Sequence, residues 1–362
     1  MVKNLRIFVV LFIALVYGGD ALACTSAIVS AAKSSEGVPL LWKHRDAPTW
    51  NCRVAYVEGE KYGYSALISL DGKYTYCGIN ERGFAVLNTV SHNIEKVREG
   101  GERGDAISLM GVILGKCATV EEFEAWLAKS NGKRRYVTNY AVGDPSGKAA
   151  YFEVSQDSYV RYDIEERKEG FDVRANYSFS GNMEKRGPSV PRYDVAMRQM
   201  QGKRSYAPHD FLEFSRNYLN CGGGCVLDEP ERVVEDNSSI ARYMASASAV
   251  MVCDAKNPRM LVAAGHPSAA MGAPVYVKAK TAIPRCVGEG DMLALCNEVR
   301  AKTYKYISDE KSRLNKSKMS KVLKVNTVCQ MPSSYPEDIV AFNAAIDKAF
   351  EEHAQQVRRA IK

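Results

Sequence analysis

The sequence predicts an α+β fold in which β-sheets are covered by helices. Short apolar runs bounded by turn residues recur from residue 24 to residue 90, two helical patterns follow over 104–130, and strand patterns resume at 136. Strands followed by helices and then by strands again are typical of sheets with helices packed on their outer faces. The 362 residues contain no internal repeat and no low-complexity linker. We therefore expect one domain over 24–285 and a mainly helical extension over 286–362 packed on the same domain.

The first strands are predicted from apolar runs and the turns between them. The cluster KSSEG separates the first two runs and indicates a hairpin, and Asp71-Gly72 is typical of a tight turn. A turn-like NERG then leads into a further buried strand. The predicted strands of this first half are 24–31, 38–46, 53–59, 64–70 and 74–79, followed by a turn and a buried strand within 79–90.

The helices are predicted from apolar spacing and capping residues. Residues 104–117 carry apolar side chains at helical spacing, and Thr119 with Glu122 resembles a capping box before a helix over 120–130, which ends at Asn131-Gly132. Further strands are expected at 136–144, 148–154, 158–164, 171–179, 246–254 and 259–265, and further helices near 192–201, 208–219 and 335–361.

Charge and histidine patterns exclude several function classes. The net charge of +7 is spread through the chain, and the lysine-rich piece 309–324 is typical of a solvated helix face, so we expect no nucleic-acid partner. The five histidines show neither HExxH nor paired spacing, so we expect no metal. No cofactor motif is found either. A small N-acyl amide is the partner we expect, and a homo-oligomer stays open.

Residues 1–23 have the pattern of a secretory signal. Lys3 and Arg6 precede an apolar stretch of 13 residues, and Ala21-Leu22-Ala23 supplies a small–x–small cleavage site. A membrane-spanning helix needs about 20 apolar residues, so this stretch is short for one. We therefore expect a secreted or periplasmic protein that begins at Cys24, without a transmembrane segment once the signal is removed.

The ten cysteines leave two alternatives open. A cysteine directly after a signal can be lipidated, although Ala21 and Leu22 stand in the reverse of the order usual in lipoprotein signals. It can also be disulfide-bonded. If Cys24 is set aside, nine cysteines remain, an odd number that cannot pair completely within one chain. The stretch CGGGC at 221–225 is interpreted as structural, because a zinc site would need further ligands nearby.

An N-terminal cysteine carries both a nucleophile and a base on one residue. The free α-amine has a pKa of about 7.7–8.0, close to working pH, where a general base is most effective. Nucleophiles activated by a terminal amine are an established class. Before cleavage the same nitrogen is an amide and cannot accept a proton. Removal of the signal would therefore create the base next to the Cys24 thiol.

The sequence around Cys24 resembles the opening of the choloylglycine hydrolase and penicillin acyltransferase superfamily of N-terminal nucleophile enzymes. The segment CTSAIVSAAKSSEGVPLLWKHRD (24–46) is similar to the family's first two strands, which end in a basic residue and an aspartate. The resemblance implies that Cys24 is the nucleophile and that Asp46 fixes the amine or the nucleophile. Lys43 stands where the family usually has arginine, and we expect it to bind substrate.

The resemblance continues over roughly residues 24–265. GINERGFAVLNT (78–89) implies that Asn88 contributes to an oxyanion hole, chiefly through its backbone N–H. VGDPSGKAAYFEV (142–154) is similar to a family hairpin that ends at Glu153. VRANYSFSG (173–181) implies that Asn176 donates its side-chain amide, and SSIARYM (238–244) implies that Arg242 lies near the active site. Taken singly, each of these residues could be a strand-end cap, a turn residue or part of an ion pair.

Together these features predict an exported cysteine amidohydrolase with a four-layer αββα fold. It would cleave a linear amide C–N bond, outside rings and proteins, through a thioester on Cys24. Substrates of related enzymes include conjugated bile salts, penicillin V, acyl-homoserine lactones and N-acyl amino acids. Three alternatives stay open: an acyltransferase of the same fold, a lipid-anchored binding protein acylated at Cys24, and a disulfide-stabilised structural protein.

Overall fold

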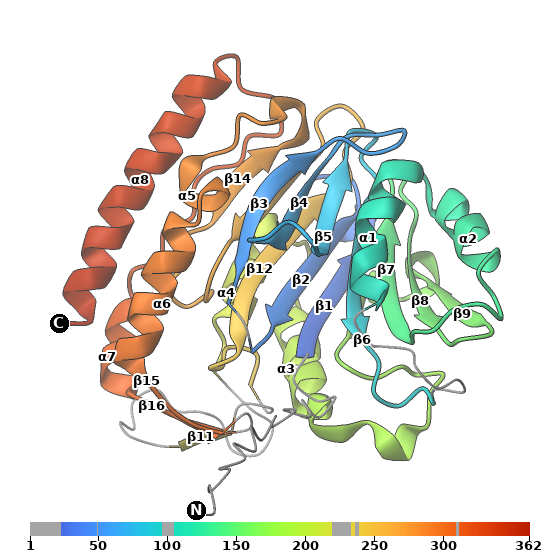
Figure 1. Ribbon diagram of the computed structural model, residues 1–362, viewed down its shortest axis with the longest axis horizontal. Coiled ribbons are helices and arrows are strands. Elements are labelled where there is room, and N and C mark those ends of the chain that lie inside the picture. Colours follow the sequence, from blue (N-terminus) through green and yellow to red (C-terminus); the bar gives the residue numbers. More distant parts are fainter. Residues whose placement is uncertain (1–22, 49, 96–104, 219–232, 236–238, 309–310) are drawn as a thin grey trace, which may run out of the picture.

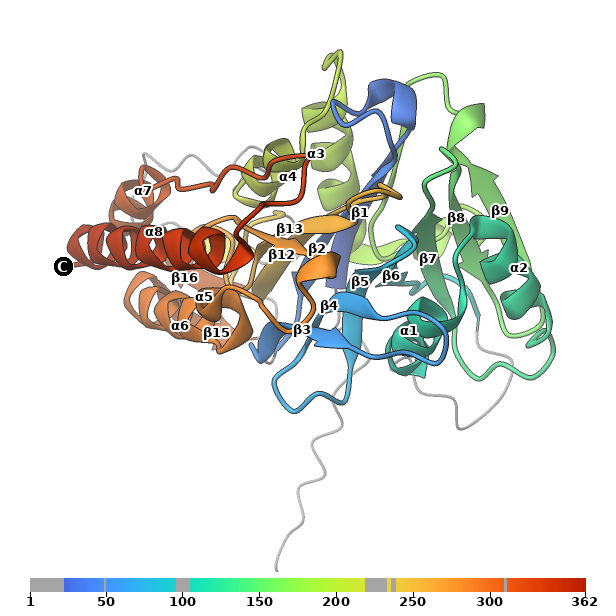
Figure 2. The same ribbon diagram turned by 90° about the horizontal axis from the view of Figure 1, so that it is seen from above.

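Two antiparallel β-sheets lie face to face and carry helices on their outer faces (Figures 1 and 2). The computed structural model describes residues 23–48, 50–95, 105–218, 233–235, 239–308 and 311–362. Residues 1–22 of the predicted signal (1–23) and the CGGGC stretch lie outside the described residues. The predicted α+β class and its layered sandwich are confirmed.

In the described part of the chain, six strands form the sheet that contains Cys24. Its central strands pair β1 with β2 and β2 with β12, and every neighbouring pair is antiparallel. The strand order across this sheet is β10 (Phe171–Arg174), β1 (Ala23–Val29), β2 (Leu40–Asp46), β12 (Ala245–Val252), β13 (Arg259–Ala263) and β14 (Ala273–Tyr276).

The second sheet is built from strands that follow one another along the chain. Each strand pairs with the next, and short loops join them except between β6 and β7, where helices α1 (Asp105–Lys116) and α2 (Val120–Ala128) intervene. One of these turns contains Gly72, whose φ of 76° is the left-handed conformation that glycine adopts without strain. The strands are β3 (Cys52–Val57), β4 (Tyr64–Ser69), β5 (Thr75–Asn80), β6 (Ala85–Val90), β7 (Thr138–Gly143), β8 (Ala149–Val154) and β9 (Tyr159–Asp163).

Helices α1 (Asp105–Lys116) and α2 (Val120–Ala128) cover the outer face of the second sheet. The predicted cap of α2 is present, since the Thr119 hydroxyl accepts a hydrogen bond from the Glu122 backbone N–H at 3.1 Å. The Glu122 carboxylate reaches back to the Ala118 N–H, one residue before the position of a standard capping box.

Helices α3 (Val190–Met200) and α4 (Pro208–Ser215) cover the outer face of the Cys24 sheet. Trp42 of β2 is fully buried there against Phe211 of α4, and its indole N–H donates to the Ser215 and Ser248 hydroxyls. A buried indole needs such an acceptor, so these bonds set where α4 lies on the sheet.

The C-terminal part of the chain packs at one side of the sandwich (Figure 1). Phe350 of the last helix belongs to the same buried cluster as Leu41, which lies between the sheets. The sequence missed β14 and a small sheet in which two strands of the extension pair with each other and one of them pairs with β11 (Val233–Glu235), so this part contains strands as well as helices. Its elements are α5 (Arg285–Gly288), α6 (Asp291–Thr303), β15 (Tyr304–Ser308), β16 (Lys311–Leu314), α7 (Lys316–Leu323) and α8 (Ile339–Ala360).

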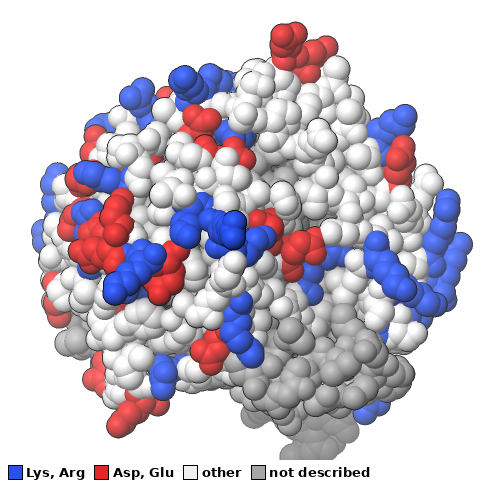
Figure 3. Space-filling model, turned by 180° about the vertical axis from the view of Figure 1, so that it is seen from behind, with Lys and Arg blue, Asp and Glu red and all other residues white. Residues whose placement is uncertain are grey.

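Within the described ranges, no helix has the length and apolarity that crossing a membrane requires. Nor do the described residues contain a group of three or more histidine, cysteine or acidic side chains placed to hold a metal ion. On the face shown in Figure 3, lysine and arginine side chains are interspersed with aspartate and glutamate.

Candidate active site

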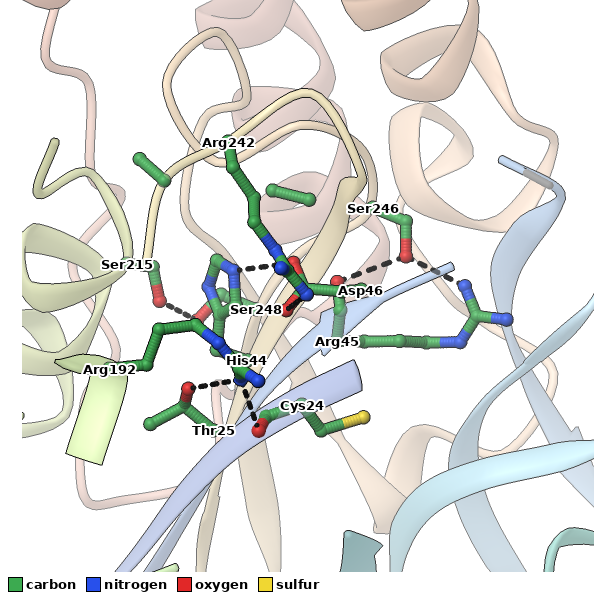
Figure 4. A network of polar contacts seen from close by, with 12 residues as sticks. Cys24, Thr25, His44, Arg45, Asp46, Arg192, Ser215, Arg242, Ser246 and Ser248 are labelled. Atoms are coloured by element: carbon green, nitrogen blue, oxygen red, sulfur yellow. Dashed lines mark hydrogen bonds and ion pairs between the residues drawn. The ribbon is translucent and has the colours of Figure 1, made fainter. Parts of the chain in front are cut away.

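Cys24 is the second residue of β1 and lies at the edge of the space between the two sheets. In the antiparallel ladder it stands opposite Arg45, and Ser26 stands opposite Lys43. Residues opposite each other point to the same face of a sheet. The Cys24 thiol therefore shares its face with the Arg45 and Lys43 side chains, and Figure 4 shows the thiol and the Arg45 side chain directed the same way. Cys24 is 7% exposed, with Ala23 still attached to it in the structure.

The backbone nitrogen of Cys24 is held by Asn176. It donates a hydrogen bond of 2.7 Å to Asn176 Oδ1. The amide nitrogen of Asn176 donates to the Val90 carbonyl at 3.0 Å, so the side chain that was expected to donate to an oxyanion holds the nucleophile's nitrogen instead. Its donation to an oxyanion stays a prediction.

Lys43 and Asn88 form a second contact beside the thiol. Lys43 Nζ donates to the Asn88 backbone oxygen at 2.7 Å and to Asn88 Oδ1 at 2.9 Å. Burial lowers the pKa of Lys43, whereas the nearby Cys24 sulfur raises it. The ladder between β5 and β6 ends at the pair Cys77–Leu87, so Asn88 lies one residue beyond it. In the structure Lys43 therefore hydrogen-bonds to Asn88, whereas from the sequence we expected Lys43 to bind substrate.

Asp46 stands on the other face of β2, opposite Ala23 in the ladder. Its carboxylate accepts from Arg242 at 2.8 Å and lies 3.2 Å from His44 Nε2. Burial alone would raise the pKa of Asp46, but the Arg242 guanidinium and His44 outweigh it and hold that pKa well below its usual range. The Arg242 carbonyl in turn lies 2.8 Å from His266 Nε2. Asp46 and Arg242 therefore form a buried ion pair beside Ala23. Cleavage after Ala23 would free the Cys24 amine.

Asp46 should make folding stability depend on acid pH. Because its pKa is lower in the folded chain than the value of about 3.9 in the unfolded chain, its contribution is fully present above pH 4 and is lost as pH falls through the folded pKa. We expect Asp46→Asn to lower the free energy of unfolding at pH 7, and the gap to the parent to shrink below about pH 4. Urea unfolding at pH 7, 4 and 3 measures this. A gap that stays constant over this range would contradict the lowered pKa.

The site is strongly cationic. Three buried cations surround it: Arg45 stands opposite Cys24 in the ladder, Lys43 stands opposite Ser26, and Arg242 bonds to Asp46. Excess positive charge stabilises a developing oxyanion. Burial raises the pKa of the neighbouring Cys77 thiol to about 12, so that thiol stays protonated. All cysteines in the described ranges carry free thiols, Cys24 among them, so the disulfide-bonded alternative for Cys24 is wrong for this structure.

Residues 54–205 match the family model of the acyl-coenzyme A:6-aminopenicillanic acid acyl-transferases. This part of the chain is similar to that family. The superfamily expected from the opening motif is thereby confirmed. The acyl-transferase match contains Asn88 and Asn176, but it begins after Cys24 and Asp46 and ends before Arg242. No curated protein matches the chain by sequence.

Solved structures of three amide hydrolases are similar to the chain. Penicillin V acylase from Agrobacterium tumefaciens is 17% identical, with a TM-score of 0.42 over 67% of this chain and 83% of that one. A variant of conjugated bile acid hydrolase from Clostridium perfringens is 10% identical, with a TM-score of 0.43 over 70% and 92%. The N-acylethanolamine-hydrolyzing acid amidase orthologue from Caenorhabditis elegans is 16% identical, with a TM-score of 0.43 over 63% and 92%.

Sequence analysis missed three residues of this site. His44 and Arg45 lie between the predicted Lys43 and Asp46, and β2 is a central strand whose residues are all buried. Consecutive polar residues in a buried strand break the apolar pattern, and such exceptions gather at functional sites. That signal was available in the run KHRD. The third, Arg192 of α3, follows from no local pattern, because the tertiary fold alone brings it to Cys24.

Proposed function

We propose that the chain is an exported cysteine amidohydrolase, or an acyltransferase of the same fold, that forms a thioester on Cys24. The observation that carries this proposal is the hydrogen bond of 2.7 Å between the Cys24 backbone nitrogen and Asn176 Oδ1. It holds the future terminal amine in place on the same residue as a thiol that faces Lys43 and Arg45. Asn88, Asn176, Asp46 and Arg242 would complete the site.

In the first step, the α-amine of Cys24 takes the proton of the thiol. The sulfur then attacks the carbonyl carbon of a linear amide, and a C–S bond forms as the carbonyl becomes an oxyanion. The oxyanion needs donors that are already in place, because reorganising them during the reaction would cost free energy. The Asn88 backbone N–H would be such a donor. Lys43 holds Asn88 through two hydrogen bonds and supplies positive charge beside it.

In the second step, the amide C–N bond breaks as the Cys24 ammonium returns its proton to the leaving nitrogen. Water then enters, gives a proton to the amine and attacks the thioester, and the C–S bond breaks to restore the thiol. One residue thus acts as base and then as acid in both half-reactions. No metal or cofactor is required for this sequence.

Acyl transfer is the second candidate, and the family match over 54–205 favours it. The two activities share the thioester and differ only in whether water or an amine attacks it. Adding a primary amine acceptor to the reaction separates them. A hydrolase would release the free acid at an unchanged yield, whereas a transferase would produce the new amide at the expense of the acid.

The mature N-terminus should have the mass of a chain that begins at Cys24 with a free amine. On brief incubation with a reactive N-acyl amide, we expect Cys24 to gain the mass of the acyl group, and hydroxylamine to remove it. Intact-mass spectrometry of protein from an export-competent host measures both. A chain that begins elsewhere would contradict the proposal, and a diacylglycerol-modified cysteine would establish the lipid-anchored alternative.

A further inference from the structure

Arg192 reaches Cys24 from the helical layer outside the sheet. It lies in α3, is 1% exposed, and donates to the Cys24 carbonyl oxygen at 2.9 Å (Figure 4). It also donates to Asn176 Oδ1 at 3.0 Å. We propose that Arg192 is a positioning residue that keeps the α-amine of mature Cys24 in its neutral, proton-accepting form. The inference rests on the proposed function, since only a cleaved chain has that amine.

The first part of the argument is the orientation of Asn176. Its Oδ1 accepts from the Cys24 nitrogen and from Arg192, and its Nδ2 donates to the Val90 carbonyl. With these three partners, rotating the amide by half a turn would place Nδ2 against the Arg192 guanidinium, donor against donor. Asn176 is therefore fixed as an acceptor toward the Cys24 nitrogen. A neutral amine satisfies it with one N–H and keeps its lone pair free for the thiol proton.

The second part is electrostatic. The Cys24 nitrogen and Arg192 share one acceptor atom, so they lie at most the sum of the two bond lengths, 5.7 Å, apart. A like charge at this distance disfavours an ammonium. Burial and the neighbouring Arg242 lower the pKa of Arg192, but only to about 9, so its guanidinium stays charged at neutral pH. Protonation of the amine would place two cations on the same oxygen atom.

The other charged groups around the amine act in both directions. Asp46 favours the ammonium, but its carboxylate is already bound to Arg242 and lies beside His44. The remaining cations disfavour it, and the Cys77 thiol is neutral. The titratable and charged groups that surround Cys24 are Lys43, His44, Arg45 and Asp46 from β2, Cys77 from β5, Arg192 from α3 and Arg242 before β12.

Arg192 also anchors α3 to β1, so the test must separate its charge from its packing. We would prepare Arg192→Gln, which keeps donors and loses the charge, and Arg192→Lys, which keeps the charge. The pKa of the Cys24 amine is measured without substrate, by competitive acetylation of the terminus over pH 5–10 followed by peptide mass spectrometry. We expect Arg192→Gln to raise this pKa by about one unit, and Arg192→Lys to leave it within a few tenths of the parent value.

The pH dependence of kcat/KM should change in the same variants as the amine pKa. The acid limb of the kcat/KM profile should move to higher pH by the same unit in Arg192→Gln and should be restored in Arg192→Lys. Arg134→Lys changes another buried arginine, which bonds only to neutral oxygens near the end of α2, and should move neither readout. Arg192→Met is the second neutral variant if Arg192→Gln does not fold.

An unchanged amine pKa in a folded neutral variant overturns the inference, as does an equal shift in Arg192→Lys. Because the amine is titrated directly, this result stands apart from catalysis. A mature Cys24 terminus that responds to Arg192 but cleaves no amide would leave the positioning role intact and refute the hydrolase.

Discussion

Cys24→Ala is expected to reduce amide hydrolysis by roughly 10⁴-fold or more, because removal of a nucleophile leaves only binding and oxyanion stabilisation. The fold should persist. The change removes one sulfur atom from the edge of the intersheet space, and Cys24 donates only its backbone nitrogen to Asn176. Initial rates with the best amide substrate measure the loss, and circular dichroism with thermal unfolding checks the fold.

Cys117→Ala is the matched control for this variant. Cys117 is also a buried free thiol, but it follows the end of α1 in the outer layer. We expect parent activity from it. If Cys24→Ala retained the parent rate, the thioester mechanism would be wrong, whatever the state of the N-terminus.

Asn176→Ala should produce the second largest effect, a fall in kcat of about 10²–10³-fold, typical of losing one preorganised polar group at an acyl-transfer site. The side chain holds the Cys24 nitrogen and receives Arg192, so its loss removes the orientation of the amine. The variant should also be less stable, because Asn176 is fully buried with three hydrogen bonds, and leaving their partners without a bond should cost about 1–3 kcal/mol.

Asn80→Ala separates the two consequences. Asn80 is also fully buried and donates to the Leu114 and Cys117 carbonyls, at the end of β5 that turns into the start of β6. It should lose a similar amount of stability with kcat within a few-fold of the parent. Urea unfolding and steady-state kinetics on both variants decide the matter. Equal losses of kcat in the two would show that Asn176 acts only through stability.

The local elements were predictable to the extent that they follow from neighbouring residues. The strands around Cys24, the capped helix after Thr119 and the long last helix follow from apolar period and turn chemistry, which act over a few residues. The strands of the C-terminal part were missed. Residues 304–308 and 311–314 pair with each other, and 311–314 also pair with β11, and such long-range pairing overrides local propensity.

A register shift near the site shows the same limit. The ladder between β12 and β2 passes from Ala245 to Ala247, so Ser246 is an extra residue in β12. Its hydroxyl accepts from Arg45 at 2.6 Å and donates to the Arg45 carbonyl at 3.1 Å. Bulges of this kind often lie next to active sites, where they redirect a side chain. Nothing in the sequence Ser-Ala-Ser-Ala (246–249) indicates which of the two serines is the extra residue in the ladder.

The sequence by itself determined the sheet-and-helix class of this protein and the candidate residues Cys24, Lys43, Asp46, Asn88 and Asn176, since each lies in a short pattern or a family motif. Only the tertiary structure decided which atoms meet. In the folded chain the Asn176 side chain binds the Cys24 nitrogen and Lys43 binds Asn88. Arg192, which lies in a helix 168 residues away along the chain, contacts Cys24. The physical reason is that hydrogen bonds act over about 3 Å in space, and chain positions far apart reach that distance only when both sheets and their helices have packed.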